Sequence, residues 1–208
     1  MNLTVEYSKP EIKNAFEWQL SQEINLKDEH NNIVAKAEIE LLTLNKHRGA
    51  DESYELLIQQ GATDWEIPLN LYFKKQNIIN ELAEKLAIKS DSKAKTHILI
   101  EAFSVLPNHR NQGIAKTLLK AITEQHTKAQ SISLLSMPMA SFLDAEDCES
   151  EESKQYYQDL AIEKDTLTRS ELRDVFKKLG FLAIDIDDSQ LAEPLAFDIF
   201  IANPTSLQ

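Results

Sequence analysis

The chain has 208 residues, which is long enough for one domain with a sizeable hydrophobic core. Its formal net charge of −12 argues against nucleic acid as a partner, because binding to phosphates relies on clustered Lys and Arg. The single cysteine, Cys148, excludes an intramolecular disulfide framework and a thiolate-rich metal cage. With only 4 Gly and 6 Pro, the composition argues against a long flexible linker. We therefore expect one domain over residues 1–208.

Nothing in the sequence predicts a membrane segment. The first residues lack the basic stretch and apolar run of a secretory signal, and the longest nearly apolar run, residues 98–106, is far too short to cross a bilayer. We expect a soluble cytoplasmic protein without a membrane partner. The five histidines show no metal-ligand spacing, so no metal is expected. The acidic balance is compatible with a cationic small molecule or a basic protein as substrate.

The first half of the chain predicts a hairpin followed by helices. Residues 16–28 and 33–44 have extended apolar patterns on either side of turn residues, which is typical of a β-hairpin. A short helix is expected near residues 53–60, ending at Gly61. Thr63 and Asp64 could cap the next helical stretch, which has Pro68 near its first turn. Residues 76–88 have helical apolar spacing, and residues 90–95 read as a polar loop.

The second half predicts a strand, a helix and further strands. Residues 98–106 form an apolar strand, residues 107–113 a turn, and residues 114–126 a helix. Residues 131–137 read as a strand, residues 144–152 as an exposed acidic loop or helix start, and residues 170–178 as a helix before Gly180. Two closing strands are expected at residues 181–186 and 195–202. This order is typical of a mixed α/β sheet with helices on its faces.

The turn before residue 114 has the features of an anion site. A strand enters a tight loop containing Gly113, and a helix starts immediately afterwards. The free N–H groups and the dipole at a helix N-terminus favour a phosphate, and Gly113 and the small Ala115 let the backbone approach it. No Gly-Lys-Ser/Thr follows, so the segment is no P-loop, and it lacks the three spaced glycines of a dinucleotide fingerprint.

The spacing Arg110-x-x-Gly113-x-Ala115 resembles the acetyl-CoA signature of the GNAT N-acetyltransferases. A second match, residues 176–181, is similar to the late helix of that family, which ends in a Gly-Phe pair before the next strand. The resemblance covers roughly residues 98–186. It implies a central, mostly antiparallel sheet with splayed strands flanked by helices.

The resemblance also implies the roles of particular residues. In the family, the strand corresponding to residues 101–105 parts from its neighbour at a bulge, and the pantetheine arm of acetyl-CoA pairs with the exposed backbone. The contacts to that arm would come from Phe103, Ser104 and Val105. The pyrophosphate would be held by a loop and helix start made of Arg110, Asn111, Gln112, Gly113, Ile114, Ala115 and Lys116.

The implied activity is acetyl-CoA-dependent transfer of an acetyl group to a primary amine. The acceptor stays open between a small molecule and a protein amino group, and so does formation of a homodimer. Glu101 is the only charged residue in its apolar strand, which favours a general base that takes a proton from the amine. Alternatively, Glu101 faces an open cleft or pairs with a lysine for structural reasons.

One position departs from the family pattern. Many members have a tyrosine four residues before the late glycine, where it protonates the departing thiolate, but this chain has Phe176. Tyr156 or Tyr157 could act instead, although packing on a helix surface would also explain them. The alternative function is therefore a catalytically weak acyl-CoA-binding sensor or interaction module. A phosphate- or nucleotide-binding domain of another family is a third reading.

An acidic insertion is expected at about residues 139–168, and it could be a lid that attracts a cationic acceptor or a solvated loop. Aromatic residues in the first half could line an acceptor pocket or pack in the core. These residues are Trp18, Trp65, Tyr72 and Phe73.

Overall fold

The computed structural model describes residues 2–62, 64–88, 94–136, 151–160, 167–185 and 197–207. Its strands are β1 (Thr4–Tyr7), β2 (Glu11–Lys13), β3 (Phe16–Lys27), β4 (Ile33–Asn45), β5 (Phe73–Lys74), β6 (Asn77–Ile78), β7 (Ala94–Val105), β8 (Ala129–Ser136), β9 (Leu182–Ile184) and β10 (Asp198–Ala202). Its α-helices are α1 (Ala50–Gln59), α2 (Glu66–Tyr72), α3 (Asn80–Lys85), α4 (Ile114–Gln125), α5 (Glu151–Leu160) and α6 (Arg169–Lys178), and short 3₁₀ turns lie at Pro107–His109 and Pro204–Leu207.

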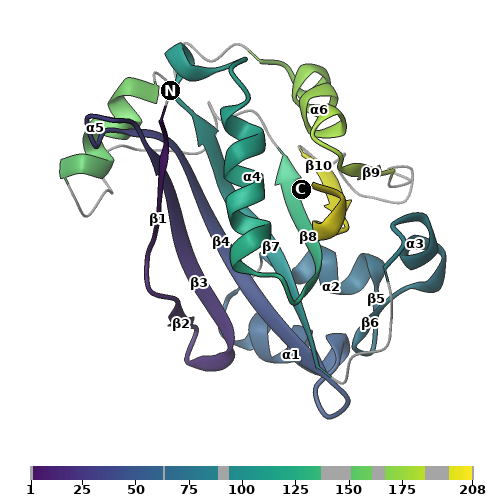
Figure 1. The fold of residues 1–208 in the computed structure, drawn as a ribbon. Helices are drawn as coiled ribbons and strands as arrows, with labels where there is room; N and C mark the ends of the chain where they lie inside the picture. The colour runs from purple at the N-terminus through teal and green to yellow at the C-terminus, as the bar shows by residue number, and fades with distance from the viewer. Residues whose placement is uncertain are drawn as a thin grey trace.

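The main sheet has eight strands in the order β1-β3-β4-β7-β8-β10-β9, with β2 paired to β3 (Figure 1). Strands β7 and β8 run parallel and are joined through α4, whereas the other pairings of the described strands are antiparallel. The prediction of a mixed, mostly antiparallel sheet with flanking helices is confirmed.

The hairpin expected near the N-terminus is β3–β4, whose register extends from Gln19 opposite Leu42 to Lys27 opposite Ile33. Its turn is closed by Asp28, whose carboxylate accepts hydrogen bonds from the N–H groups of His30 and Asn32 at 2.9 Å. Such a local bond is the usual reason that aspartate favours turns.

Two apolar cores lie on opposite faces of the sheet. On one face, α4 buries Leu118, Leu119 and Ile122 against the central strands, and Phe176 of α6 packs into the same cluster. These spacings of one and three residues place the three α4 side chains on one helical face. On the other face, Trp65, Leu69 and neighbouring residues of α1, α2 and α3 cover Leu42 and Leu99. Figure 1 shows α4 in front of the sheet and α1 and α2 behind it.

Several predicted boundaries were wrong. Residues 76–88 are not one helix, because β5 and β6 form a small hairpin and only Asn80–Lys85 is helical. Lys95 belongs to β7 rather than to a loop and is 1% exposed. Trp65, not Asp64, occupies the N-cap of α2. Most of the acidic insertion, with Cys148, lies outside the described residues, although α5 begins at Glu151.

Candidate active site

Strand β7 contains a bulge at Glu101. Against β4, Ala102 lies opposite Glu38 and Ile100 opposite Ile39, so Glu101 is the extra residue. The parallel register with β8 ends at Ile100, whereas the pairing with β4 continues to Val105. Strand β7 therefore parts from β8 beyond the bulge, and its residues 101–105 have β4 as a neighbour on one side only. Bulges often occur next to active sites, where they re-aim a side chain and end a pairing.

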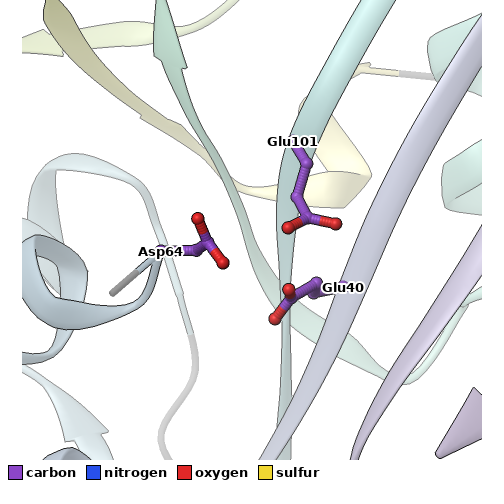
Figure 2. Close-up of side chains that lie close together, drawn as sticks. All are labelled: Glu40, Asp64 and Glu101. Carbon is purple, nitrogen blue, oxygen red and sulfur yellow. The ribbon is translucent and has the colours of Figure 1, made fainter. Parts of the chain in front are cut away.

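The bulge directs Glu101 toward a group of charged residues. Figure 2 shows the carboxylates of Glu101 from β7, Glu40 from β4 and Asp64 from the loop before α2 pointing toward one another. Their oxygens lie within 4.8 Å of one another. Lys13 of β2 bridges them: its Nζ lies 2.7 Å from Glu101 Oε1 and 3.8 Å from Asp64 Oδ2, and it also contacts Glu40 Oε1. The lysine thus supplies a positive charge where three carboxyl groups converge.

Glu40 is fully buried and held on both oxygens. Its Oε2 accepts hydrogen bonds from Gln19 Nε2 at 2.8 Å and from the indole N–H of Trp65 at 2.6 Å, while Oε1 contacts Lys13. A buried carboxylate needs such partners to stay in the apolar sheet face. Trp65 was one of the aromatic residues that could line an acceptor pocket or pack in the core. It lies in the core and donates a hydrogen bond to Glu40.

The pKa values of the two glutamates are shifted in opposite directions. Burial raises the pKa of Glu101 to about 8, and the adjacent Glu40 carboxylate adds to this more than Lys13 offsets it. Burial also opposes ionisation of Glu40, but the hydrogen bonds from Glu101, Lys13 and Gln19 outweigh it and hold the pKa of Glu40 below its usual range. Glu40 therefore stays ionised, and Glu101, with fewer donors and 24% of its side chain exposed, holds the exchangeable proton.

The loop before α4 ends in a glycine with a left-handed backbone. Gly113 is the N-cap of α4 with φ 80°, a left-handed conformation that favours glycine, and a Cβ there would meet nothing within 4 Å. The space beside Gly113 is therefore open. The next three N–H groups, from Ile114 to Lys116, have no acceptor inside the helix by its geometry. The first turn of α4 contains no acidic residue that would repel a phosphate.

Side chains of the preceding loop fold back onto the protein. The Arg110 side chain donates through Nε to the carbonyl of Val105 at 3.0 Å, and the backbone N–H of Arg110 donates to the carbonyl of Pro107 at 3.3 Å. Gln112 Nε2 donates to the carbonyl of Asn108 at 2.8 Å. Asn111 adopts a positive φ of 60°. The side-chain bonds of Arg110 and Gln112 hold the loop next to the end of β7.

The predicted residues of the splayed segment face different surroundings. Phe103 is half-buried and packs against Phe176, with ring centroids 6.4 Å apart, whereas Ser104 is buried on the other side of the strand. Ser104 Oγ and the hydroxyl of Tyr156 lie 2.8 Å apart. Tyr157 donates to Glu38 Oε1 at 3.1 Å. Both tyrosines belong to α5 and are buried, and Tyr156 lies against the segment that parts from β8.

Phe176 lies in an aromatic cluster. Its ring centroid is 5.3 Å from that of Phe200 and 6.0 Å from that of Phe181, and the residue is 8% exposed. The phenyl ring fills the core and offers no proton.

Sequence reasoning selected Glu101 but missed its partners. Lys13, Gln19, Glu40 and Asp64 come from four separate segments that only the fold brings together. One signal was available for Glu40: it lies two residues before Leu42 on the buried face of an apolar strand, the same anomaly that singled out Glu101.

Residues 40–139 match the model of the family described as the acetyltransferase (GNAT) family. The central part of the chain is therefore similar to the GNAT family. The matched segment contains the bulge in β7, the loop at Gly113 and all of α4. The match indicates acetyl transfer as the chemistry of this segment. No curated protein matches the sequence significantly.

Solved structures similar to this chain include three acetyltransferases. The Bacillus subtilis N-acetyltransferase YlbP in complex with coenzyme A is 12% identical, with a TM-score of 0.40 over 89% of this chain and 70% of that one. A Drosophila melanogaster polyamine N-acetyltransferase is 12% identical, with a TM-score of 0.42 over 87% and 74%. Arabidopsis thaliana NAA60 in complex with acetyl-CoA is 12% identical, with a TM-score of 0.40 over 88% and 73%.

The helices in the described part of the chain are short. The longest of them, α4, has 12 residues, and none combines the length and the hydrophobicity that a membrane span requires.

Proposed function

We propose that this protein transfers the acetyl group of acetyl-CoA to a primary amine, with Glu101 as the general base. The observation that supports this most directly is the bulge at Glu101, beyond which β7 continues without β8. The bulge aims a carboxylate at the place where an added strand, the pantetheine arm, would begin. The same bulge therefore supplies both the proton acceptor and the cosubstrate groove.

The proposed reaction needs a neutral amine. The acceptor nitrogen gives a proton to the Glu101 carboxylate and attacks the thioester carbonyl, a C–N bond forms, and the C–S bond breaks. A backbone N–H of β7 stabilises the oxyanion, and the departing thiolate takes up a proton from water. The raised pKa of Glu101 suits this role, because a base works best with a pKa near the operating pH.

For the cosubstrate, we propose two sets of contacts. The backbone of Phe103, Ser104 and Val105 would pair with the pantetheine arm. The N–H groups between Asn111 and Lys116 would hold the pyrophosphate, with the Lys116 side chain adding positive charge and Arg110 and Gln112 fixing the loop. Support for this comes from the open space at Gly113 and from the unsatisfied first turn of α4.

We also propose that residues 1–208 form a single domain. The support is that β1, near the start of the chain, and β10, near its end, belong to the same eight-stranded sheet.

The test of the proposed function is release of the CoA thiol from acetyl-CoA in the presence of a panel of amines. The panel contains diamines, arylalkylamines and peptides with free α-amino or lysine groups. Amine-dependent thiol release, with the acetylated amine identified by mass spectrometry, is the expected result. Absence of turnover with every amine, by protein that binds acetyl-CoA, would contradict the proposal and favour the second candidate.

The second candidate is a catalytically weak acyl-CoA-binding module. The observation that favours it is Phe176, which replaces the usual proton donor with a buried ring. General-acid help is worth about 10²–10⁴-fold in rate. A single-turnover measurement with pre-bound acetyl-CoA separates the two candidates, since an enzyme consumes the bound thioester when amine is added and a sensor leaves it intact.

A further inference from the structure

We propose that Lys13 is an intramolecular acetyl acceptor, so that the protein acetylates itself at this residue when no external amine is present. The inference rests on the proposed function, because it requires acetyl-CoA in the groove beside β7. It goes beyond that function by naming one specific amine and a covalent modification of the chain.

The position of the Lys13 amine carries the inference. An acceptor nitrogen must lie within hydrogen-bond distance of the general base, and Lys13 Nζ lies 2.7 Å from Glu101 Oε1. It is a primary amine, the class that the proposed reaction uses. Lys13 therefore occupies the place where an external acceptor would put its nitrogen.

The hairpin β2–β3 positions Lys13 next to Glu101. Strand β2 pairs with β3 from Glu11 opposite Ser21, and the register shifts between Ile12 and Lys13. The following turn contains Asn14 at φ 52° and Ala15 at φ 61°, both left-handed. Alanine rarely adopts that conformation, which costs roughly 1–2 kcal/mol, so the turn is held by its surroundings. Lys13 is bound at both carboxylates yet 30% of its side chain is exposed.

The self-acetylation step balances without any further reactant. Lys13 in its neutral form gives one proton to the ionised Glu101 as its nitrogen attacks the thioester carbonyl, which forms the amide C–N bond. The C–S bond breaks, and the CoA thiolate takes up the proton that Glu101 received, directly or through water. The products are Nε-acetyl-Lys13 and free CoA.

The charges around Lys13 make this reaction depend on pH. The groups that face its Nζ are Glu40 from β4, Glu101 from β7 and Asp64 from the loop before α2. The bonds to Glu101 and Glu40 outweigh burial and raise the pKa of Lys13. The amine is mostly protonated at neutral pH, so self-acetylation is slow there and becomes faster as pH rises.

Other lysines provide matched controls. Lys36 also lies between two carboxylates, with Nζ 2.7 Å from Glu23 and 3.1 Å from Glu38, but its partners do not include Glu101. Lys120 is 54% exposed and pairs with Glu124 at 3.6 Å, so it reports unspecific chemical acetylation. A reaction directed by Glu101 discriminates between Lys13 and both of these.

The experiment incubates the purified full chain with isotope-labelled acetyl-CoA and no external amine, followed by peptide mapping at several times. The expected result is one labelled acetyl group at Lys13, formed at least tenfold faster than at Lys36 or Lys120. In Glu101→Gln, labelling of Lys13 should fall by about 10²–10⁴-fold, while that of Lys120 stays unchanged. Lys13→Arg, which keeps the charge, should lose the label.

Four results would overturn the inference. Equal labelling of Lys13 and Lys120, or labelling of Lys13 that is unchanged in Glu101→Gln, would identify simple chemical acetylation. No label at Lys13, in protein that acetylates external amines, would reject self-acetylation and leave the proposed function intact. Failure to bind acetyl-CoA by calorimetry would reject both together.

Discussion

Glu40 and Glu101 carry the same functional group within one cluster, but their surroundings shift the pKa values of the two carboxyl groups in opposite directions. Glu40 is enclosed by Gln19, Trp65 and Lys13, all of which donate to it, so its charge is satisfied. Glu101 reaches the partly exposed side and has Lys13 as its donor. The buried carboxylate thus keeps the charge, and its neighbour is left to exchange a proton.

The role of Glu101 is testable by removing its basicity alone. Glu101→Gln keeps the shape of the side chain and cannot accept a proton as a carboxylate does. We expect acetyl transfer to amines to fall by about 10²–10⁴-fold, while the affinity for acetyl-CoA stays within a few-fold. Steady-state kinetics and calorimetry measure the two quantities. An unchanged turnover would show that the pairing of Glu101 with Lys13 is structural.

The pH dependence of the reaction tests the coupling between the two glutamates. Because a general base acts in its ionised form, the proposed role of Glu101 requires kcat/KM to rise with pH through a pKa of about 8. Glu40→Gln removes a neighbouring negative charge, which favours ionisation of Glu101, so the rise should shift to lower pH. A pH–rate profile of Glu40→Gln that coincides with that of the unmodified protein would contradict the coupling.

At the scale of elements, β7 and α4 act as one unit. The strand frees one side of its backbone beyond Ile100, and the helix that follows it presents its N-terminus at the same end of the strand. Figure 1 shows the upper ends of β7 and β8 diverging, with α4 in front of them. The unit is local in sequence, which explains why its motif could be read directly.

Gly113 and Gly61 allow a matched test of the helix N-terminus. Both have left-handed φ, 80° and 72°, and a Cβ at either would meet nothing within 4 Å. Gly113→Val and Gly61→Val should each lower the free energy of unfolding by about 1–2 kcal/mol. Only Gly113→Val should weaken acetyl-CoA binding, because the valine side chain would occupy the proposed pyrophosphate site. Equal affinity of the two variants would contradict the assignment.

Phe176 tests what α6 contributes. Truncating this ring removes its contacts with Phe103, Phe181 and Phe200, so Phe176→Ala should lower the free energy of unfolding by about 3–5 kcal/mol. Denaturant unfolding measures this loss, and Val175→Ala, on the same helix but 39% exposed, is the control. A loss below 1 kcal/mol would mean that the ring is not part of the core.

At the scale of the whole molecule, the sequence predicted what is local and missed what is distant. The hairpin β3–β4, helix α4 and the strand around Glu101 follow from periodicity and turn residues within short windows. Strand β6 falls within residues 76–88, which the sequence predicts as helix, because Ile78 shares the helical spacing of the apolar residues of α3 and tertiary packing overrides such a pattern.

The carboxylate cluster could not be predicted in the same way. Lys13 and Glu101 are 88 residues apart, and Trp65 and Glu40 are 25 apart. Their meeting depends on which strands become neighbours in the sheet and on the β2–β3 turn, neither of which a local pattern specifies. The sequence pointed to Glu101 because it is a charged residue in an apolar strand, whereas its partners could be identified only from the fold.

The most direct test of this account is a calorimetric titration with acetyl-CoA, run on the unmodified protein, Gly113→Val and Gly61→Val, with ATP and NAD as control ligands. The account predicts that the unmodified protein and Gly61→Val bind acetyl-CoA in preference to both controls, and that Gly113→Val loses most of this affinity. No binding of acetyl-CoA to the folded, unmodified protein would contradict the account.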